Sequence, residues 1–184
     1  TPQRLLIMVG LPLGLLIALL SPAWTAYDEF THFARVVDMA QGNLEPARTP
    51  EGVGSVIPSA YREATDEIIL GHQAGRPPWT PTSVRALLGY RPDGSTVFVD
   101  TRPTTASSPL GYLPATLGAL VPVAVGAPGV VVVWAGRLAS LAAYLLLAAW
   151  AVRTAAAFRW SIAIAATIPL NLALAASLSP DGLT

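Results

Sequence analysis

Three long apolar runs, separated by polar segments, dominate the pattern of the chain. They cover Leu5 to Trp24, Val130 to Val152 and Ser161 to Leu178. A helix rises about 1.5 Å per residue, so about 20 apolar residues cross a hydrocarbon core of roughly 30 Å. The pattern therefore predicts three transmembrane helices. A signal peptide with a cleavage site near Ala23 and Thr25 is the alternative for the first run.

A fourth apolar segment, Pro109 to Ala127, is interrupted by prolines and glycines. If it crossed the membrane, Arg4 and the loop that holds Arg153 and Arg159 would lie on opposite sides. Arginine-rich short loops tend to remain cytoplasmic. We therefore expect this segment to be an interfacial or re-entrant helix on the outer side, and we expect the N-terminus to be cytoplasmic.

The segment of residues 25–108 is polar and lies between the first two apolar runs. It contains ten of the eleven acidic residues and seven of the eleven arginines. Ser59 to Leu70 has the pattern of a short helix that ends at Gly71, and Pro92-Asp93-Gly94 predicts a turn before a strand over Thr96 to Val99. A loop of this length with internal order is usually functional. We expect an extracytoplasmic loop made mostly of short helices.

Composition supports a membrane protein, because 53% of the residues are hydrophobic and only 12% are charged, against about 25% charged in soluble domains. The net charge is zero, which gives a nucleic-acid partner no electrostatic support. The chain has no cysteine, so disulfides, thiolate metal sites and a cysteine nucleophile are excluded. No P-loop, dinucleotide fingerprint or Gly-x-Ser-x-Gly elbow occurs. Because the chain begins without methionine and stops at Thr184, directly after a polar motif, we expect it to be a fragment.

The polar segment after the first apolar run holds the main candidate catalytic groups. A helix from Asp28 would place Asp28, His32 and Arg35 on one face, at positions i, i+4 and i+7. A second, apolar stripe of the same helix would consist of Phe33, Val36, Val37 and Ala40. The alternative is a solvated amphipathic helix whose histidine is an ordinary surface residue.

A second carboxylate, Asp181, follows the third apolar run. In the predicted topology it emerges on the same outer face as Asp28. The two carboxylates could act as a general base, position an acceptor, or hold a divalent cation such as Mg or Mn against a phosphate. The candidate metal ligands are Asp28, His32 and Asp181, although one histidine with carboxylates is a weak metal signal. The alternative for Asp181 is a simple turn that caps a helix.

Arg137 interrupts the second apolar run, where an arginine costs about 2.5–3.5 kcal/mol on insertion scales and is a candidate for function. A guanidinium suits the phosphate of a lipid carrier, and a buried ion pair is the alternative. Aromatic residues at the predicted membrane interfaces could anchor the chain in the bilayer or stack on a sugar ring. These residues are Trp24, Tyr27, Trp79 and Tyr112.

Four short segments carry a resemblance to a known family. They are Asp28-Glu29-x-x-His32-Phe33-x-Arg35, Pro109-Leu110-Gly111-Tyr112-Leu113-Pro114, Gly136-Arg137-Leu138-Ala139-Ser140 and Ser177-Leu178-Ser179-Pro180-Asp181. Together they resemble domain of unknown function 2142, a bacterial family of predicted membrane proteins, and more distantly the polytopic glycosyltransferases of the GT-C fold. The resemblance covers nearly the whole chain, which looks like the N-terminal part of the family.

The resemblance implies an all-α membrane protein of the bacterial plasma membrane, with a GT-C-like N-terminal part. Such a protein would transfer a hexosyl or pentosyl group from a polyprenyl-phosphate carrier to a cell-wall or lipid glycan acceptor on the outer face. Asp28 and Glu29 would be the catalytic carboxylates, and Arg137 would contact the carrier phosphate. Further substrate contacts would come from His32, Arg35, Tyr112 and Asp181.

Two other functions fit the same residues. One is a non-catalytic transporter or flippase component for lipid-linked glycans, in which Arg137 only binds phosphate. The other is a structural anchor whose outer domain binds cell-wall polymer. The partners expected are therefore a lipid-linked sugar donor, a glycan acceptor and the membrane.

Overall fold

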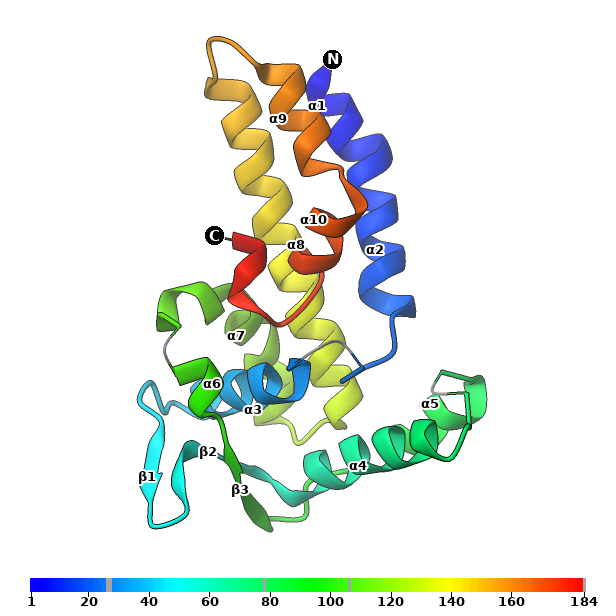
Figure 1. Cartoon of the computed structure of the whole chain (residues 1–184), viewed down its shortest axis with the longest axis vertical. Coiled ribbons are helices and arrows are strands. Elements are labelled where there is room, and N and C mark those ends of the chain that lie inside the picture. The colour runs from blue at the N-terminus through cyan, green and yellow to red at the C-terminus, as the bar shows by residue number, and fades with distance from the viewer. Residues whose placement is uncertain (26–27, 78, 106, 184) are drawn as a thin grey trace.

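A computed structural model describes residues 1–25, 28–77, 79–105 and 107–183. Apolar helices run along one half of its long axis, and shorter helices with a small sheet occupy the other half (Figure 1). The N-terminus lies at the far end of the apolar half, beside the turn between α8 (Gly129–Thr154) and α9 (Arg159–Ala166). Arg4 and this turn therefore share one end of the molecule, as the distribution of arginines led us to expect.

The first apolar run forms a continuous helical stretch over Pro2–Leu20. It consists of α1 (Pro2–Leu5), a π-helical turn η1 (Leu6–Gly10) and α2 (Leu11–Leu20). The helix ends before the predicted Trp24, because Ser21 precedes a proline and takes the extended conformation, with ψ 129°. Among the described residues, this stretch and α8 are the two that are long and apolar enough to cross a membrane.

The third predicted span, residues 161–178, is not a single helix. It divides into α9 and α10 (Pro169–Ala175). Ile168 stands before a proline and is extended, with ψ 131°, and Pro169 has no N–H to continue the helix. The side chain of Asn171 donates a 2.8 Å hydrogen bond to the carbonyl of Ala165, so a carbonyl freed by the break finds a partner. Two candidate spans therefore replace the three that the sequence pattern predicted.

The apolar segment after the polar region forms α7 (Pro109–Ala124), a helix of 16 residues that is shorter than a membrane span. It packs along the first half of α8. A Cβ atom at Gly118 would collide with the carbonyl of Ala135 and lie 2.7 Å from the Cβ of Ala139. Glycine is therefore what allows the two helices to approach so closely.

The polar half contains more strand than the single one expected, because it has a three-stranded antiparallel sheet. The strands are β1 (Ala47–Thr49), β2 (Gly52–Pro58) and β3 (Thr96–Asp100), in the order β1-β2-β3. The predicted strand over Thr96 to Val99 is confirmed as β3. The sequence pattern missed the first two strands for two reasons. β1 is only three residues long, and glycines and prolines lie within or next to both strands, where they lower strand propensity.

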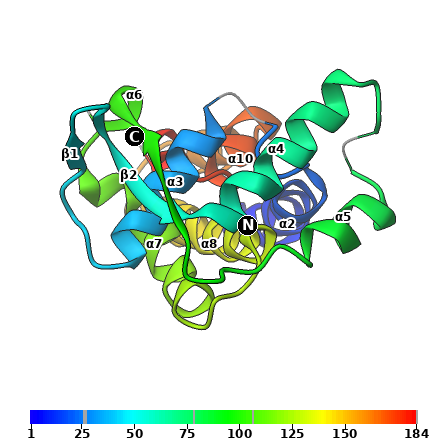
Figure 2. The same ribbon diagram turned by 90° about the horizontal axis from the view of Figure 1, so that it is seen from below.

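Four helices complete the polar half: α3 (Glu29–Ala40), α4 (Ser59–Gln73), α5 (Pro81–Leu87) and α6 (Arg102–Thr105). The predicted helix over Ser59 to Leu70 is confirmed as α4. Figure 2 shows the sheet, α3 and α4 lying across the end of the apolar helices.

The core joins the two halves at Phe33 of α3. Its ring lies 5.5 Å from the ring of Trp24 and 5.6 Å from that of Tyr61, centroid to centroid. The hydroxyl of Tyr61 donates a 3.0 Å hydrogen bond to the carbonyl of Ala127, in the turn before α8. Phe33, Val36 and Val37 of the predicted apolar stripe are thus buried, and Ala40 is partly buried, where the polar region meets the apolar helices.

Candidate functional site

The first residue of the site, Asp28, stands at the start of α3. Its backbone is left-handed, with φ 58°, a conformation that Asp adopts more readily than most residues. Its carbonyl accepts hydrogen bonds from the N–H groups of Thr31 at 3.0 Å and His32 at 3.2 Å. The carboxylate is exposed rather than used to cap the helix, so it is available to a ligand.

The second carboxylate comes from the other end of the chain. Asp181 lies in a short 3₁₀ turn (η2, Pro180–Leu183) that follows α10. Pro180 packs against Gly111 of α7, where a Cβ atom would lie 2.6 Å from the Cβ of that proline. This contact fixes the turn against α7.

The two carboxylates line one cavity of about 340 Å³ between α3 and the end of α10. His32 lies on its wall. The remaining lining residues are Glu29, Ala173, Leu174, Ser177 and Ser179. The structure therefore brings together Asp28, His32 and Asp181 from segments that are distant in sequence. Ser177 and Ser179 were not predicted as site residues. Their hydroxyls lie within four residues of Asp181 in the sequence, and this proximity could have identified them.

His32 links this cavity to α7. Its Nδ1 atom lies 2.8 Å from the hydroxyl of Tyr112, within hydrogen-bond distance. Burial lowers the pKa of His32, while the charges of Asp181 and then Asp28 act to raise it, and the net direction is downward from 6.5. The lowered pKa favours the neutral imidazole, and Tyr112 is its partner without lining the cavity itself.

Arg137 does not face this cavity as a free cation. Its five N–H groups make five hydrogen bonds, which use its whole donor capacity. Nε and Nη2 donate to the two carboxylate oxygens of Glu29, at 2.8 and 2.7 Å. Nη1 and Nη2 donate to the backbone carbonyls of Ala18, Ser21 and Pro22. Both charged side chains are 2% exposed.

The predicted roles of Glu29 and Arg137 are corrected by this geometry. A fully coordinated guanidinium has no donor left for a carrier phosphate, so Arg137 takes the alternative considered for it, a buried ion pair. Glu29 likewise accepts from Arg137 and from the N–H of Trp24, at 2.8 Å. Both oxygens of its carboxylate are therefore engaged with other groups of the chain in this arrangement.

Arg35 also differs from its predicted place. It is buried, with a side-chain nitrogen 3.8 Å from the carboxylate of Asp38 and another that donates to the carbonyl of Leu44. It does not line the cavity that contains Asp28. Burial raises the pKa of Asp38, while the hydrogen bond from Asn43 and the charge of Arg35 lower it in part. Arg35 is therefore packed between α3 and the segment of Leu44, outside the lining of this cavity.

A family model described as Predicted membrane protein (DUF2142) matches residues 11–184. The chain belongs to this family. No curated protein and no solved structure matches the chain. Membership of DUF2142 agrees with the two candidate spans and supports association with a membrane.

The DUF2142 chain offers no ready metal site in its described part. Over residues 1–25, 28–77, 79–105 and 107–183, no three His, Cys, Asp or Glu side chains gather closely enough to hold a metal ion. Asp28, His32 and Asp181 share a cavity without forming such a group. Of the four predicted aromatic contacts, Tyr27 lies outside the described residues, whereas Trp24 and Trp79 pack on protein side chains.

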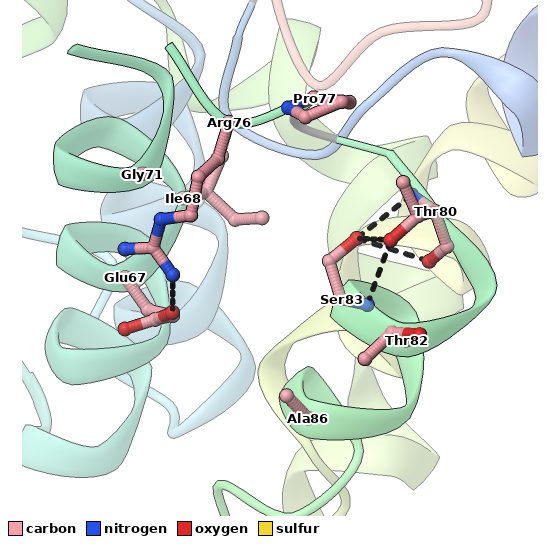
Figure 3. A pocket seen from close by; sticks show the side chains of 9 residues that line it. All are labelled: Glu67, Ile68, Gly71, Arg76, Pro77, Thr80, Thr82, Ser83 and Ala86. Atoms are coloured by element: carbon pink, nitrogen blue, oxygen red, sulfur yellow. Dashed lines mark hydrogen bonds and ion pairs between the residues drawn. The ribbon is translucent and has the colours of Figure 1, made fainter. Parts of the chain in front are cut away.

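A second cavity of the DUF2142 chain, about 250 Å³, lies between α4 and α5 (Figure 3). On one wall Arg76 forms a 3.1 Å ion pair with Glu67, and both side chains are largely exposed. On the other wall the backbone N–H of Ser83 donates to the hydroxyl of Thr80, at 3.1 Å, in a capping box. The cavity is separate from the one that Asp28 lines, and none of the predicted site residues contributes to it.

Proposed function

We propose that this chain carries the acceptor site of a membrane glycosyltransferase, which moves a sugar from a polyprenyl-phosphate carrier to a cell-envelope acceptor on the outer face. The observation that supports this proposal is the cavity shared by Asp28, His32 and Asp181. Carboxylates, an imidazole and serine hydroxyls are groups that hydrogen-bond the hydroxyls of a sugar. The distant resemblance to GT-C enzymes supplies the type of reaction.

Asp28 is the general base in this proposal. Its carboxylate takes the proton of the acceptor hydroxyl. The electron pair left on the acceptor oxygen then forms a bond to the anomeric carbon of the donor sugar. The bond between that carbon and the carrier phosphate breaks on the opposite face, so the configuration inverts and polyprenyl phosphate leaves with the bonding electrons. Base catalysis of this kind contributes roughly 10²–10⁴ in rate.

The charges of the cavity favour a neutral sugar over the carrier phosphate. Among its described lining residues there are carboxylates and no arginine, and a phosphate beside Asp28 and Asp181 would be repelled. The donors of Arg137 are already occupied. In the proposal the cavity therefore holds the reacting hydroxyl and its sugar ring, while the carrier phosphate binds outside it.

The test is donor consumption by the purified protein in detergent, where transport has no meaning. We expect the wild-type protein to hydrolyse or transfer a polyprenyl-phosphate sugar, and we expect Asp28→Asn to slow transfer by roughly 10²–10⁴. Asp66→Asn is the matched control, because Asp66 is an exposed acid paired with Arg62 on α4. Wild-type transfer by a folded Asp28→Asn variant would refute the role of Asp28. Absence of any donor consumption would favour the non-catalytic transporter.

A further inference from the structure

Arg137, paired with Glu29, caps the C-terminal end of the first apolar helix. In a continuing helix the carbonyl of Ala18 would bond the N–H of residue 22, but Pro22 has none. Arg137 fills the gap by donating to Ala18 at 3.3 Å, to Ser21 at 2.8 Å and to Pro22 at 3.0 Å. Its positive charge is also favourable at a helix C-terminus. The guanidinium therefore fixes the point at which the chain leaves α2.

The carboxylate of Glu29 also binds the backbone just after α2. Besides its bonds to Arg137, it accepts the backbone N–H of Trp24 at 2.8 Å. Trp24 and Asp28 both have left-handed backbones, with φ 59° and 58°. Such conformations are uncommon outside glycine and persist where surrounding contacts determine them. Glu29 contacts Trp24 directly through its carboxylate and is the next residue after Asp28 in the chain.

We propose that Glu29 and Arg137 are positioning residues, whose ion pair holds Asp28 against Asp181 across the cavity. The catalytic consequence rests on the proposed function, whereas the positioning is a property of the structure. A carboxylate displaced by about 1 Å can lose roughly a hundredfold in rate. A bidentate pair buried on both sides supplies the rigidity that such placement needs.

The test reads position without using activity, and the absence of native cysteine makes it direct. Asp28→Cys with Asp181→Cys places two thiols on the cavity, and a short bifunctional thiol reagent measures how fast they are linked. Ser59→Cys with Ser95→Cys is the control pair, since these hydroxyls touch between α4 and β3, away from the cavity. Both pairs are measured in the purified protein with Glu29 intact and with Glu29→Gln.

We expect Glu29→Gln to slow linking of positions 28 and 181 about tenfold, a free-energy difference of about 1.4 kcal/mol. The control pair should be linked at an unchanged rate. Arg137→Lys keeps the buried charge balanced but cannot bind the carboxylate with a planar fork, so it is expected to slow the same linking in a protein that folds. Unchanged linking of positions 28 and 181 in both variants would overturn the inference. So would an equal loss at both pairs, which indicates general unfolding.

The outcome is separable from that of the proposed function. If the wild-type protein transfers no sugar, linking still decides whether the ion pair positions residue 28. If it does transfer sugar, Glu29→Gln should lower kcat about a hundredfold, while Glu29→Asp, which keeps the charge, should recover part of the loss. A full loss in Glu29→Asp with normal linking would contradict the positioning role.

Discussion

Arg137 and Glu29 are joined by two hydrogen bonds, of 2.8 and 2.7 Å, between the first half of α8 and the first residue of α3. An arginine within an apolar run is costly unless it is paired, and here the partner belongs to the same chain. The charge that stood out in the sequence is therefore paired inside the chain, next to the cavity that we propose as the site. The site itself is the neighbouring cavity of Asp28, His32 and Asp181.

Breaking the buried pair is expected to be strongly destabilising. Glu29→Gln leaves a buried guanidinium without its counter-ion, and such a loss typically costs about 3–5 kcal/mol. Arg137→Met is expected to cost a similar amount. Thermal unfolding in detergent measures both. The double variant should be more stable than the sum of the two losses predicts, since neither charge is then left alone.

An exposed ion pair provides the control for this prediction. Arg62 and Asp66 on α4 lie 2.9 Å apart with side chains 47% and 42% exposed, and such pairs contribute less than about 1 kcal/mol. Asp66→Asn should therefore change the unfolding temperature little. Equal effects of Asp66→Asn and Glu29→Gln would argue against a buried, fully coordinated pair.

Gly118 is expected to be essential for the packing of α7 on α8. A methyl group there would collide with the backbone of Ala135 and with Ala139, so Gly118→Ala should destabilise the protein by about 1–3 kcal/mol. Leu117→Ala is the matched variant, because that neighbouring side chain is 64% exposed and its loss should cost under about 0.5 kcal/mol. Denaturant or thermal unfolding distinguishes them; similar stability of the two variants would count against the close packing of α7 on α8.

Thiol labelling in intact cells tests the orientation that we propose. The predicted topology places Thr1 and Ala156 on the cytoplasmic side and Thr82 on the outer side. A membrane-impermeant maleimide should label Thr82→Cys in intact cells, and should label Thr1→Cys or Ala156→Cys only after permeabilisation. Labelling of Ala156→Cys and Thr82→Cys from the same side would contradict the predicted topology.

Stability should depend on the protonation of His32. Because its pKa in the folded protein lies below 6.5, the unfolded chain binds the proton more readily. The stabilising contribution is thus present above about pH 6.5 and is lost as the pH falls toward the folded pKa. The unfolding temperature should decrease between pH 7.5 and 5.5, and the decrease should be smaller in His32→Gln. His72→Gln serves as the control.

Asp38 has the opposite pH dependence and must be kept in every variant compared. Its pKa is raised by burial, so the folded chain holds its proton more firmly than the unfolded chain. Its contribution therefore declines as the pH rises through the folded pKa. Comparison of His32→Gln with the wild-type protein cancels this effect. An identical pH profile for the two would exclude a contribution from His32.

The sequence predicted those features that depend on local pattern. Periodicity was enough for the apolar stripe of α3, in which Phe33, Val36 and Val37 are buried, and for α4. The strand over Thr96 to Val99 follows a clear turn signal. Asp28 and Asp181 also line one cavity, as expected, although that expectation counted residues 161–178 as a third span and the structure divides this segment into α9 and α10.

The remaining features depend on tertiary contacts that no local pattern encodes. The break at Pro169 was underestimated, because prolines are tolerated in membrane helices and only the structure shows whether the helix continues. Arg35 fell on the predicted face of α3, yet its long side chain turned toward Leu44 and Asp38. The pairing of Arg137 with Glu29 links residues 108 positions apart, and spacing alone gave no sign of it.

The most direct test of the shared site is the titration of His32 by NMR. Asp181 and Asp28 each act to raise the pKa of this imidazole, so Asp181→Asn and Asp28→Asn should each lower it further, with Asp181→Asn the larger effect. His72→Gln removes the only other histidine and assigns the signal, and Asp66→Asn should leave the titration unchanged. If neither Asp28→Asn nor Asp181→Asn shifts the His32 pKa, the two carboxylates do not surround this histidine, and the proposed site is contradicted.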